Sequence, residues 1–164
     1  MKKGKFLKIA GLLFLGFVVY ALGYYRNYVF LLVNAQSAAV YYHEPPISPN
    51  GLLHFIADKN YSSLVHIKWG LTFLFFILFF IVSLTGIYFI FKEKAYLLLC
   101  IVFYCALLFA SFLFMLAGYA SASIAEPAYN ISRSLIHIGQ SPFTFLLLCM
   151  IIFYHKRRFQ HEHK

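Results

Sequence analysis

Charged residues are scarce in this sequence, and acidic residues are nearly missing. Aspartate and glutamate together account for 5 of the 164 residues, and charged residues of both signs make up 12%. A soluble domain contains roughly a quarter charged residues. This composition therefore excludes an ordinary soluble globular fold, and it leaves few carboxylates for acid–base catalysis or for metal binding.

Signatures of catalytic and metal chemistry are also missing. The three cysteines, Cys100, Cys105 and Cys149, lie inside apolar stretches, and no C-x-x-C or H-E-x-x-H motif occurs. Such cysteines are typical of small apolar core residues. No pair of carboxylates falls inside an apolar segment. We expect a protein that is not an enzyme and holds neither a metal nor a cofactor.

Long apolar runs dominate what is present. Hydrophobic residues make up 62% of the chain, with 20 Phe and 13 Tyr. A membrane-spanning helix needs roughly 20 mostly apolar residues. Four segments meet this requirement, at about residues 6–25, 64–91, 95–118 and 135–154. The sequence predicts an all-α, integral membrane four-helix bundle that forms one transmembrane domain over residues 1–164.

The basic residues predict the orientation of this bundle. Ten of them fall at the two ends of the chain and in the turn between the second and third segments, and four fall in the other connections or near the opposite helix ends. Cytoplasmic loops carry the excess of Lys and Arg, so both termini are expected in the cytoplasm. The formal charge of +9 follows from this rule, and we expect no nucleic-acid partner.

Two segments carry alternatives. Residues 26–63 are expected to form an outer loop, in which Pro45, Pro46 and Pro49 prevent regular structure and residues 51–58 form a short interfacial helix. The first apolar segment follows a basic stretch and contains Ala21-Leu22-Gly23, which resembles a signal-peptide cleavage site. An uncleaved first helix is the preferred interpretation.

Polar residues gather at the expected outer ends of the helices. Arg133, His137 and Gln140 are spaced by four and three residues, which places them on one face of a continuous fourth helix. Ionisable residues inside membranes usually face other helices or partners rather than lipid. These three residues are candidates for binding a partner or a lipid headgroup. Three more candidates lie near the outer ends of the other helices: Arg26, His66 and Lys68.

The stretch "RSLIHIGQSPFTFLLLCMIIFYH" resembles the C-terminal helix of the exosortase F and X type accessory proteins. Arg133, Ile136 and His137 match its arginine and Ile-His pair, and the apolar run at 145–148 precedes the matching aromatic and basic residues Phe153, Tyr154 and Lys156. The stretches "KWGLTFLFFILFFIVSLTGIYFIFKEK" and "RNYVF" are similar to other parts of that family. The resemblance implies a small multi-pass protein of the bacterial inner membrane that accompanies an exosortase, an enzyme that processes sorting signals.

The preferred functional hypothesis is a non-enzymatic accessory subunit of such a protein-sorting system. Its polar face on the fourth helix would bind the exosortase-like enzyme or the helix of a sorting signal. One alternative is a membrane protein that binds or transports a lipid headgroup or a small anion through the same basic residues. A second is a haem-binding redox protein, with His66 and His137 as axial ligands.

Overall fold

The protein is almost entirely helical over the residues that its computed structural model describes, 2–45 and 51–162. No strand occurs within these ranges. The helices are α1 (Lys2–Tyr41), η1 (Gly51–Ile56), α2 (Tyr61–Phe91), α3 (Lys94–Ala120), η2 (Ala122–Ile124), α4 (Ala125–Gly139) and α5 (Pro142–Glu162). The prediction of an all-α class is confirmed.

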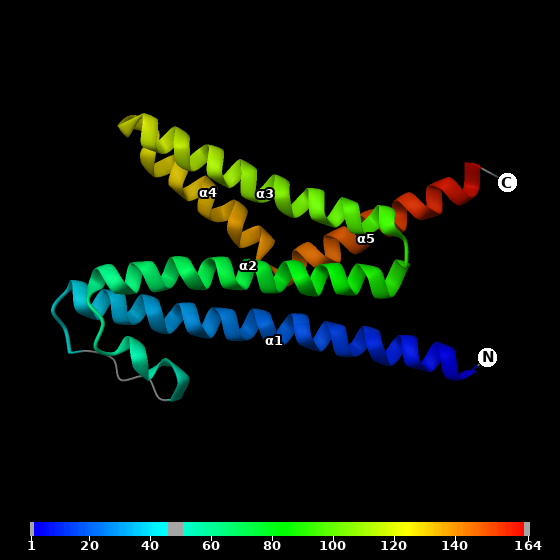
Figure 1. Ribbon diagram of the computed structural model, residues 1–164, viewed down its shortest axis with the longest axis horizontal. Coiled ribbons are helices and arrows are strands. Elements are labelled where there is room, and N and C mark those ends of the chain that lie inside the picture. Colours follow the sequence, from blue (N-terminus) through cyan, green and yellow to red (C-terminus); the bar gives the residue numbers. More distant parts are fainter. Residues whose placement is uncertain (1, 46–50, 163–164) are drawn as a thin grey trace.

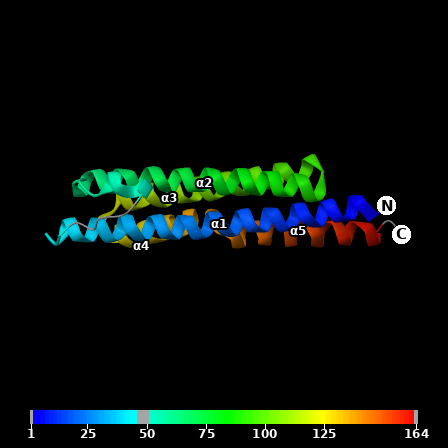
Figure 2. The same cartoon turned by 90° about the horizontal axis from the view of Figure 1, so that it is seen from below.

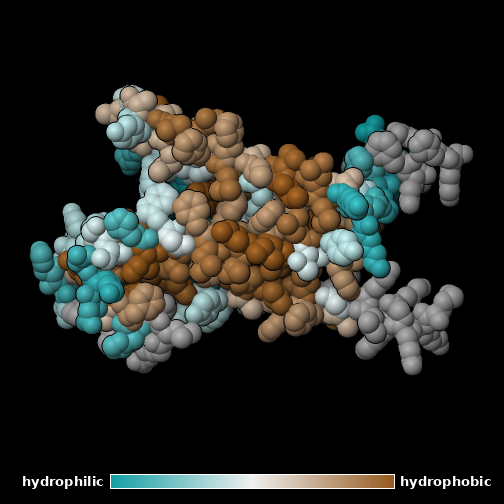
Figure 3. Space-filling view, viewed as in Figure 1, coloured by the Kyte–Doolittle hydropathy of each residue, from teal (hydrophilic) through white to brown (hydrophobic). Residues whose placement is uncertain are grey.

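Three helices are long and apolar enough to cross a membrane, namely α1 from Leu13 to Tyr41, α2 and α3. The α4–α5 pair meets the same criterion only as a unit, and its two halves are bent by 67°. Figure 3 shows apolar side chains covering the middle of the molecule, with polar ones gathered towards its two ends. The chain is a multi-pass membrane protein by these properties.

Both termini and the turn between α2 and α3 lie at the same end of the molecule (Figures 1 and 2). At this basic end, Lys156 of α5 donates to Glu93 of the turn at 2.5 Å. Successive helical passes therefore alternate in direction. The sequence predicted an even number of spans, which requires both termini to lie at the same end. The cytoplasmic location of this end remains a prediction from the positive-inside rule.

The first helix extends much further than the expected 6–25. It continues without a break to Tyr41, so residues 26–41 are helical and not part of an outer loop. Val29, Val33 and Gln36 are buried at helical spacing, and they pack this extension against the first half of α2. One arginine at position 26 marked the end of the apolar run in the sequence, but a single charge does not end a helix that gains tertiary contacts.

The expected interfacial helix 51–58 is a 3-10 helix, η1, which packs on α1 and α2. Its Ile56 is fully buried in a cluster with Val33 and Leu64. Gln36 of α1 donates to the carbonyl of Ala57 at 2.8 Å, which fixes the end of η1 against α1. Pro45 lies in non-helical chain, whereas Pro46 and Pro49 lie outside the described residues.

Local signals define the ends of α2. Asn60 is its N-cap, because the Asn60 side chain accepts a hydrogen bond from the Ser63 amide at 2.9 Å. The helix therefore starts a turn before the expected residue 64. At the other end Lys92 has a positive φ of 59°, a conformation that terminates helices. The third helix matches its expected range of 95–118 closely.

The expected fourth helix, 135–154, is wrong as a single element. The helix α4 starts earlier, at Ala125, and ends at Gly139, and α5 starts at Pro142 and continues beyond residue 154. Proline has no amide hydrogen, and its ring clashes with the carbonyl four residues earlier. Because Pro142 follows a glycine and two polar residues, the chain breaks here instead of kinking.

Candidate functional site

The helix break is built from residues that bond to one another's backbone. Ser141 Oγ accepts from the Phe143 amide at 3.2 Å, and the Thr144 hydroxyl donates to the Ile138 carbonyl. A Cβ on Gly139 would lie 2.4 Å from a ring carbon of Phe76, so only glycine permits this approach of α4 to α2. These contacts satisfy groups that a broken helix would otherwise leave unpaired in the membrane.

Arg26 of α1 reaches across to this break. Its Nε donates to Gln140 Oε1 at 2.9 Å, its Nη1 donates to Asn27 Oδ1 at 2.9 Å, and its Nη2 contacts His137 Nδ1. The guanidinium carbon lies 5.2 Å from the centre of the Phe30 ring. The three groups that contact this half-buried cation are not carboxylates, and no carboxylate among the described residues pairs with it.

Gln140 connects the helix break to α2 by a hydrogen bond. Its Nε2 donates to the Thr72 carbonyl at 2.5 Å, while its Oε1 accepts from Arg26. Only 2% of Gln140 is exposed. This residue was expected on the binding face, but both ends of its amide are used inside the bundle. Its amide joins Arg26 of α1 to the backbone of α2, and it also lines the cavity described below.

Two further cations lie beside His137. Arg133, one turn earlier on α4, directs its Nε towards His137 Nε2 at 3.4 Å. Lys68 of α2 lines the same cavity as Arg133 and His137. None of Arg26, Lys68 and Arg133 forms an ion pair with a carboxylate whose position the structure describes. We call Arg26, Lys68, Arg133, His137 and Gln140 the polar cluster.

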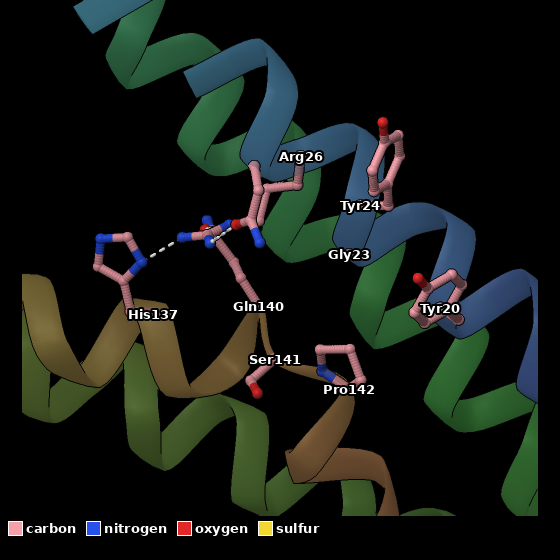
Figure 4. A pocket seen from close by; sticks show the side chains of 9 residues that line it. Tyr20, Gly23, Tyr24, Arg26, His137, Gln140, Ser141 and Pro142 are labelled. Atoms are coloured by element: carbon pink, nitrogen blue, oxygen red, sulfur yellow. Dashed lines mark hydrogen bonds between the residues drawn. The ribbon is translucent and has the colours of Figure 1, made fainter. Parts of the chain in front are cut away.

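Two cavities adjoin the polar cluster on either side of His137. The α1–α5 cavity, of about 470 Å³, is partly open and lies between α1 and the helix break (Figure 4). It is lined by Arg26, Gln140, Ser141, Pro142 and the exposed Tyr20 and Tyr24, among others. The α2–α4 cavity, of about 240 Å³, is lined by Lys68 and Arg133 with Tyr61, Trp69 and Tyr129. His137 lines both.

The polar cluster lies about one membrane thickness from the basic end. From Thr72 to Phe91, α2 rises about 28 Å at about 1.5 Å per residue. The hydrocarbon core of a bilayer is about 30 Å thick. A bilayer that begins at the basic end would place the cluster at its opposite boundary. Arg26 reaches this level from the middle of α1, not from the helix end that the sequence suggested.

Five of the six candidate residues converge, and His66 does not. His66 is exposed, and its ring Nδ1 bonds to the Ser62 carbonyl at 2.8 Å. It lines neither cavity, whereas His137 lines both. Neither cavity is therefore lined by both histidines of the haem hypothesis, and these two cavities give that hypothesis no support.

Several residues of the site were not predicted from the sequence. Asn27 and the backbone of Thr72 bind cluster members, Ser141 caps the break, and aromatic side chains form cavity walls. The spacing of Tyr20, Tyr24 and Asn27 on one helical face is a signal that was available. The contact to Thr72 had no signal, because any backbone carbonyl can accept a hydrogen bond.

No known family model matches the chain, and neither a curated protein nor a solved structure shows significant similarity to it.

Proposed function

We propose that this protein is a non-enzymatic accessory subunit of an exosortase-type sorting system in the bacterial inner membrane. In this proposal, the α1–α5 cavity holds an acidic or carbonyl-rich group of a membrane partner. The partner is the exosortase-like enzyme or the helix of a sorting signal. The observation that carries the proposal is Arg26, a half-buried cation that lines an open cavity with only neutral acceptors around it.

Arg26 is equipped to bind one more group. A guanidinium has five N–H donors in a planar fork, and three are engaged by Gln140, Asn27 and His137. The other two remain for a ligand. Burial of a charge is unfavourable unless it is paired, so a carboxylate or a carbonyl group that enters the cavity relieves this cost.

The shape of the site suits a helix that approaches within the membrane. Tyr20 and Tyr24 are 69% and 66% exposed on α1, and both line the cavity. Figure 4 shows Pro142 and Ser141 on the opposite wall, where the chain leaves α4. A partner helix lying along this flank of α1 would present its polar groups to Arg26 at the level of the break.

The link to exosortases comes from the resemblance of residues 133–156 to the accessory family. Arg133 and His137, which match the family's arginine and Ile-His pair, are both members of the polar cluster. The cluster in this chain also includes Arg26, at the start of the "RNYVF" stretch. The matching stretches, far apart in the sequence, thus meet at one site.

Recovery of the partner in mild detergent tests this proposal. The tagged protein is purified from its native membrane and its partners are identified by mass spectrometry. Wild type is expected to retain an exosortase-like enzyme or a protein with a sorting signal. Hydrogen bonds to charged groups contribute about 1.5–3 kcal/mol, so Arg26→Gln should lower recovery by about ten- to a hundredfold.

Arg157→Gln is the matched control, because Arg157 is an exposed arginine at the basic end. It should leave recovery at the wild-type level. Equal recovery with Arg26→Gln and wild type would contradict the proposed role of the cavity. Failure of Arg26→Gln to accumulate would show that Arg26 is required for folding, and the exposed Tyr24→Ala would then test the same cavity.

A further inference from the structure

We propose that the α2–α4 cavity is a second binding site, which takes the phosphate group of a lipid headgroup or free phosphate. It lies on the other side of His137 from the α1–α5 cavity and shares no other lining residue with it. The proposal goes beyond the binding of a protein partner and does not depend on it. Two cations, Lys68 and Arg133, line this cavity without a carboxylate among its described lining residues, and they carry the argument.

The first observation is that His137 faces two arginines. Its Nδ1 contacts Arg26 Nη2, and its Nε2 faces the donor Nε of Arg133 at 3.4 Å. A guanidinium can only donate, and a neutral imidazole has one acceptor nitrogen. His137 therefore cannot accept from both arginines at once, and an anion oxygen near Arg133 would supply the missing acceptor.

The donors are the cations themselves. Lys68 on α2 and Arg133 on α4 line the cavity from two helices, and two like charges that line one cavity repel each other. No carboxylate lines this cavity, and no acceptor among the described residues is bonded to the Lys68 ammonium group. An anion between the two side chains would replace this repulsion with two charge-assisted hydrogen bonds.

The donor set favours a phosphate over a carboxylate. A carboxylate offers two oxygens in one plane, whereas a phosphate presents its oxygens in several directions and can meet donors from α2 and α4 together. The cavity volume of about 240 Å³ exceeds the size of one such group, which leaves room for an attached glycerol. Tyr61, Trp69 and Tyr129 line the same space, and such aromatic residues favour the headgroup level of membranes.

Thermal unfolding of the purified protein in dodecyl maltoside tests this site. The protein is freed of lipid and titrated in parallel with dioleoyl-phosphatidylglycerol, with inorganic phosphate and with uncharged dioleoylglycerol. A saturable rise in Tm with phosphatidylglycerol alone identifies a lipid headgroup as the ligand. A rise with inorganic phosphate as well identifies the phosphate group itself as sufficient.

Lys68→Gln and Arg133→Gln should each raise the half-saturating concentration about tenfold or more, because each removes one charged donor. Arg133 is exposed, so its replacement keeps the test available if Lys68→Gln fails to fold. Lys59→Gln, at an exposed lysine on the same side of the molecule, should respond as wild type does.

Three results would overturn the proposal: no response to either phosphate compound, an equal rise with dioleoylglycerol, or unchanged affinity in both variants. The titration contains no protein partner. Failure of the phosphate site therefore leaves the proposed sorting function standing, and loss of partner recovery leaves the phosphate site standing.

Discussion

Two groups of polar side chains that lie between the described helices are satisfied in different ways. In the first, Ser83 pairs with Tyr104 at 2.9 Å and Ser111 pairs with Ser132 at 2.7 Å. All four residues are buried, neutral and matched donor to acceptor. The second is the polar cluster, where cations meet neutral acceptors and one another.

This difference distinguishes side chains that hold helices together from side chains that we propose bind a ligand. Paired hydroxyls complete their hydrogen bonds within the chain and need nothing further, so they hold helices together. The polar cluster keeps donors and positive charge in excess, and it adjoins two cavities. Helices that needed only polar contacts with one another would not require three cations that lack a carboxylate partner among the described residues. We interpret the excess as a site for a ligand that the chain itself does not supply.

The largest expected effect comes from Gly139, which connects the two regions. A Cβ added at Gly139 would clash with the Phe76 ring, and Phe76 contacts the Tyr104 ring with centroids 5.4 Å apart. Gly139→Leu would force α4 away from α2, and overpacking of this kind costs about 1–3 kcal/mol. We expect a lower Tm together with loss of partner recovery. A Cβ on Gly70 meets nothing within 4 Å, so Gly70→Leu should change neither measurement.

A smaller and more selective effect is expected when a carboxylate is placed beside Arg26 in the polar cluster. Asn27 Oδ1 accepts from Arg26 Nη1 at 2.9 Å, so Asn27→Asp substitutes a carboxylate of the same shape. Asn27 is exposed, and exposed ion pairs contribute about 0.2–1 kcal/mol. We expect a slightly higher Tm and a loss of partner recovery, because Arg26 then has an internal anion.

Asn34→Asp is the matched control for charge, since Asn34 is also exposed on α1. It should alter neither stability nor recovery. If Asn27→Asp binds the partner as well as wild type does, Arg26 does not act through its unpaired charge, and the difference between the two polar groups loses its functional meaning.

The sequence predicted the helical class and the position of α3 closely, because long apolar runs leave few alternatives. It did not predict that α1 extends past Arg26, since Val29, Val33 and Gln36 become helical through contacts with distant residues. It also did not predict the complete break before Pro142. A proline inside a membrane helix can kink it or end it, and the outcome depends on which neighbours accept the freed groups.

The site was predicted in composition but not in geometry. Arg133 and His137 lie one turn apart on α4, as their spacing implied. Gln140 was expected to continue that face, yet it lies at the break and turns inward to Thr72. That Arg26 from α1 completes the cluster required knowledge of which helices are neighbours, and four apolar helices can pack in several orders.

The smallest expected effect belongs to the paired hydroxyls. Tyr104→Phe removes the hydrogen bond to Ser83 but keeps the ring contacts with Phe76, Phe80 and Phe103. Interhelical hydrogen bonds in membranes contribute about 0.6 kcal/mol on average, and Ser83 can bond instead to its own helix backbone. We expect a Tm slightly below wild type and partner recovery within about twofold of wild type. Arg26→Gln should show the reverse pattern, with little change in Tm and a large loss of recovery. If Tyr104→Phe lost the partner, the neutral pair would belong to the binding apparatus, and charge excess would no longer distinguish the site from the rest of the bundle.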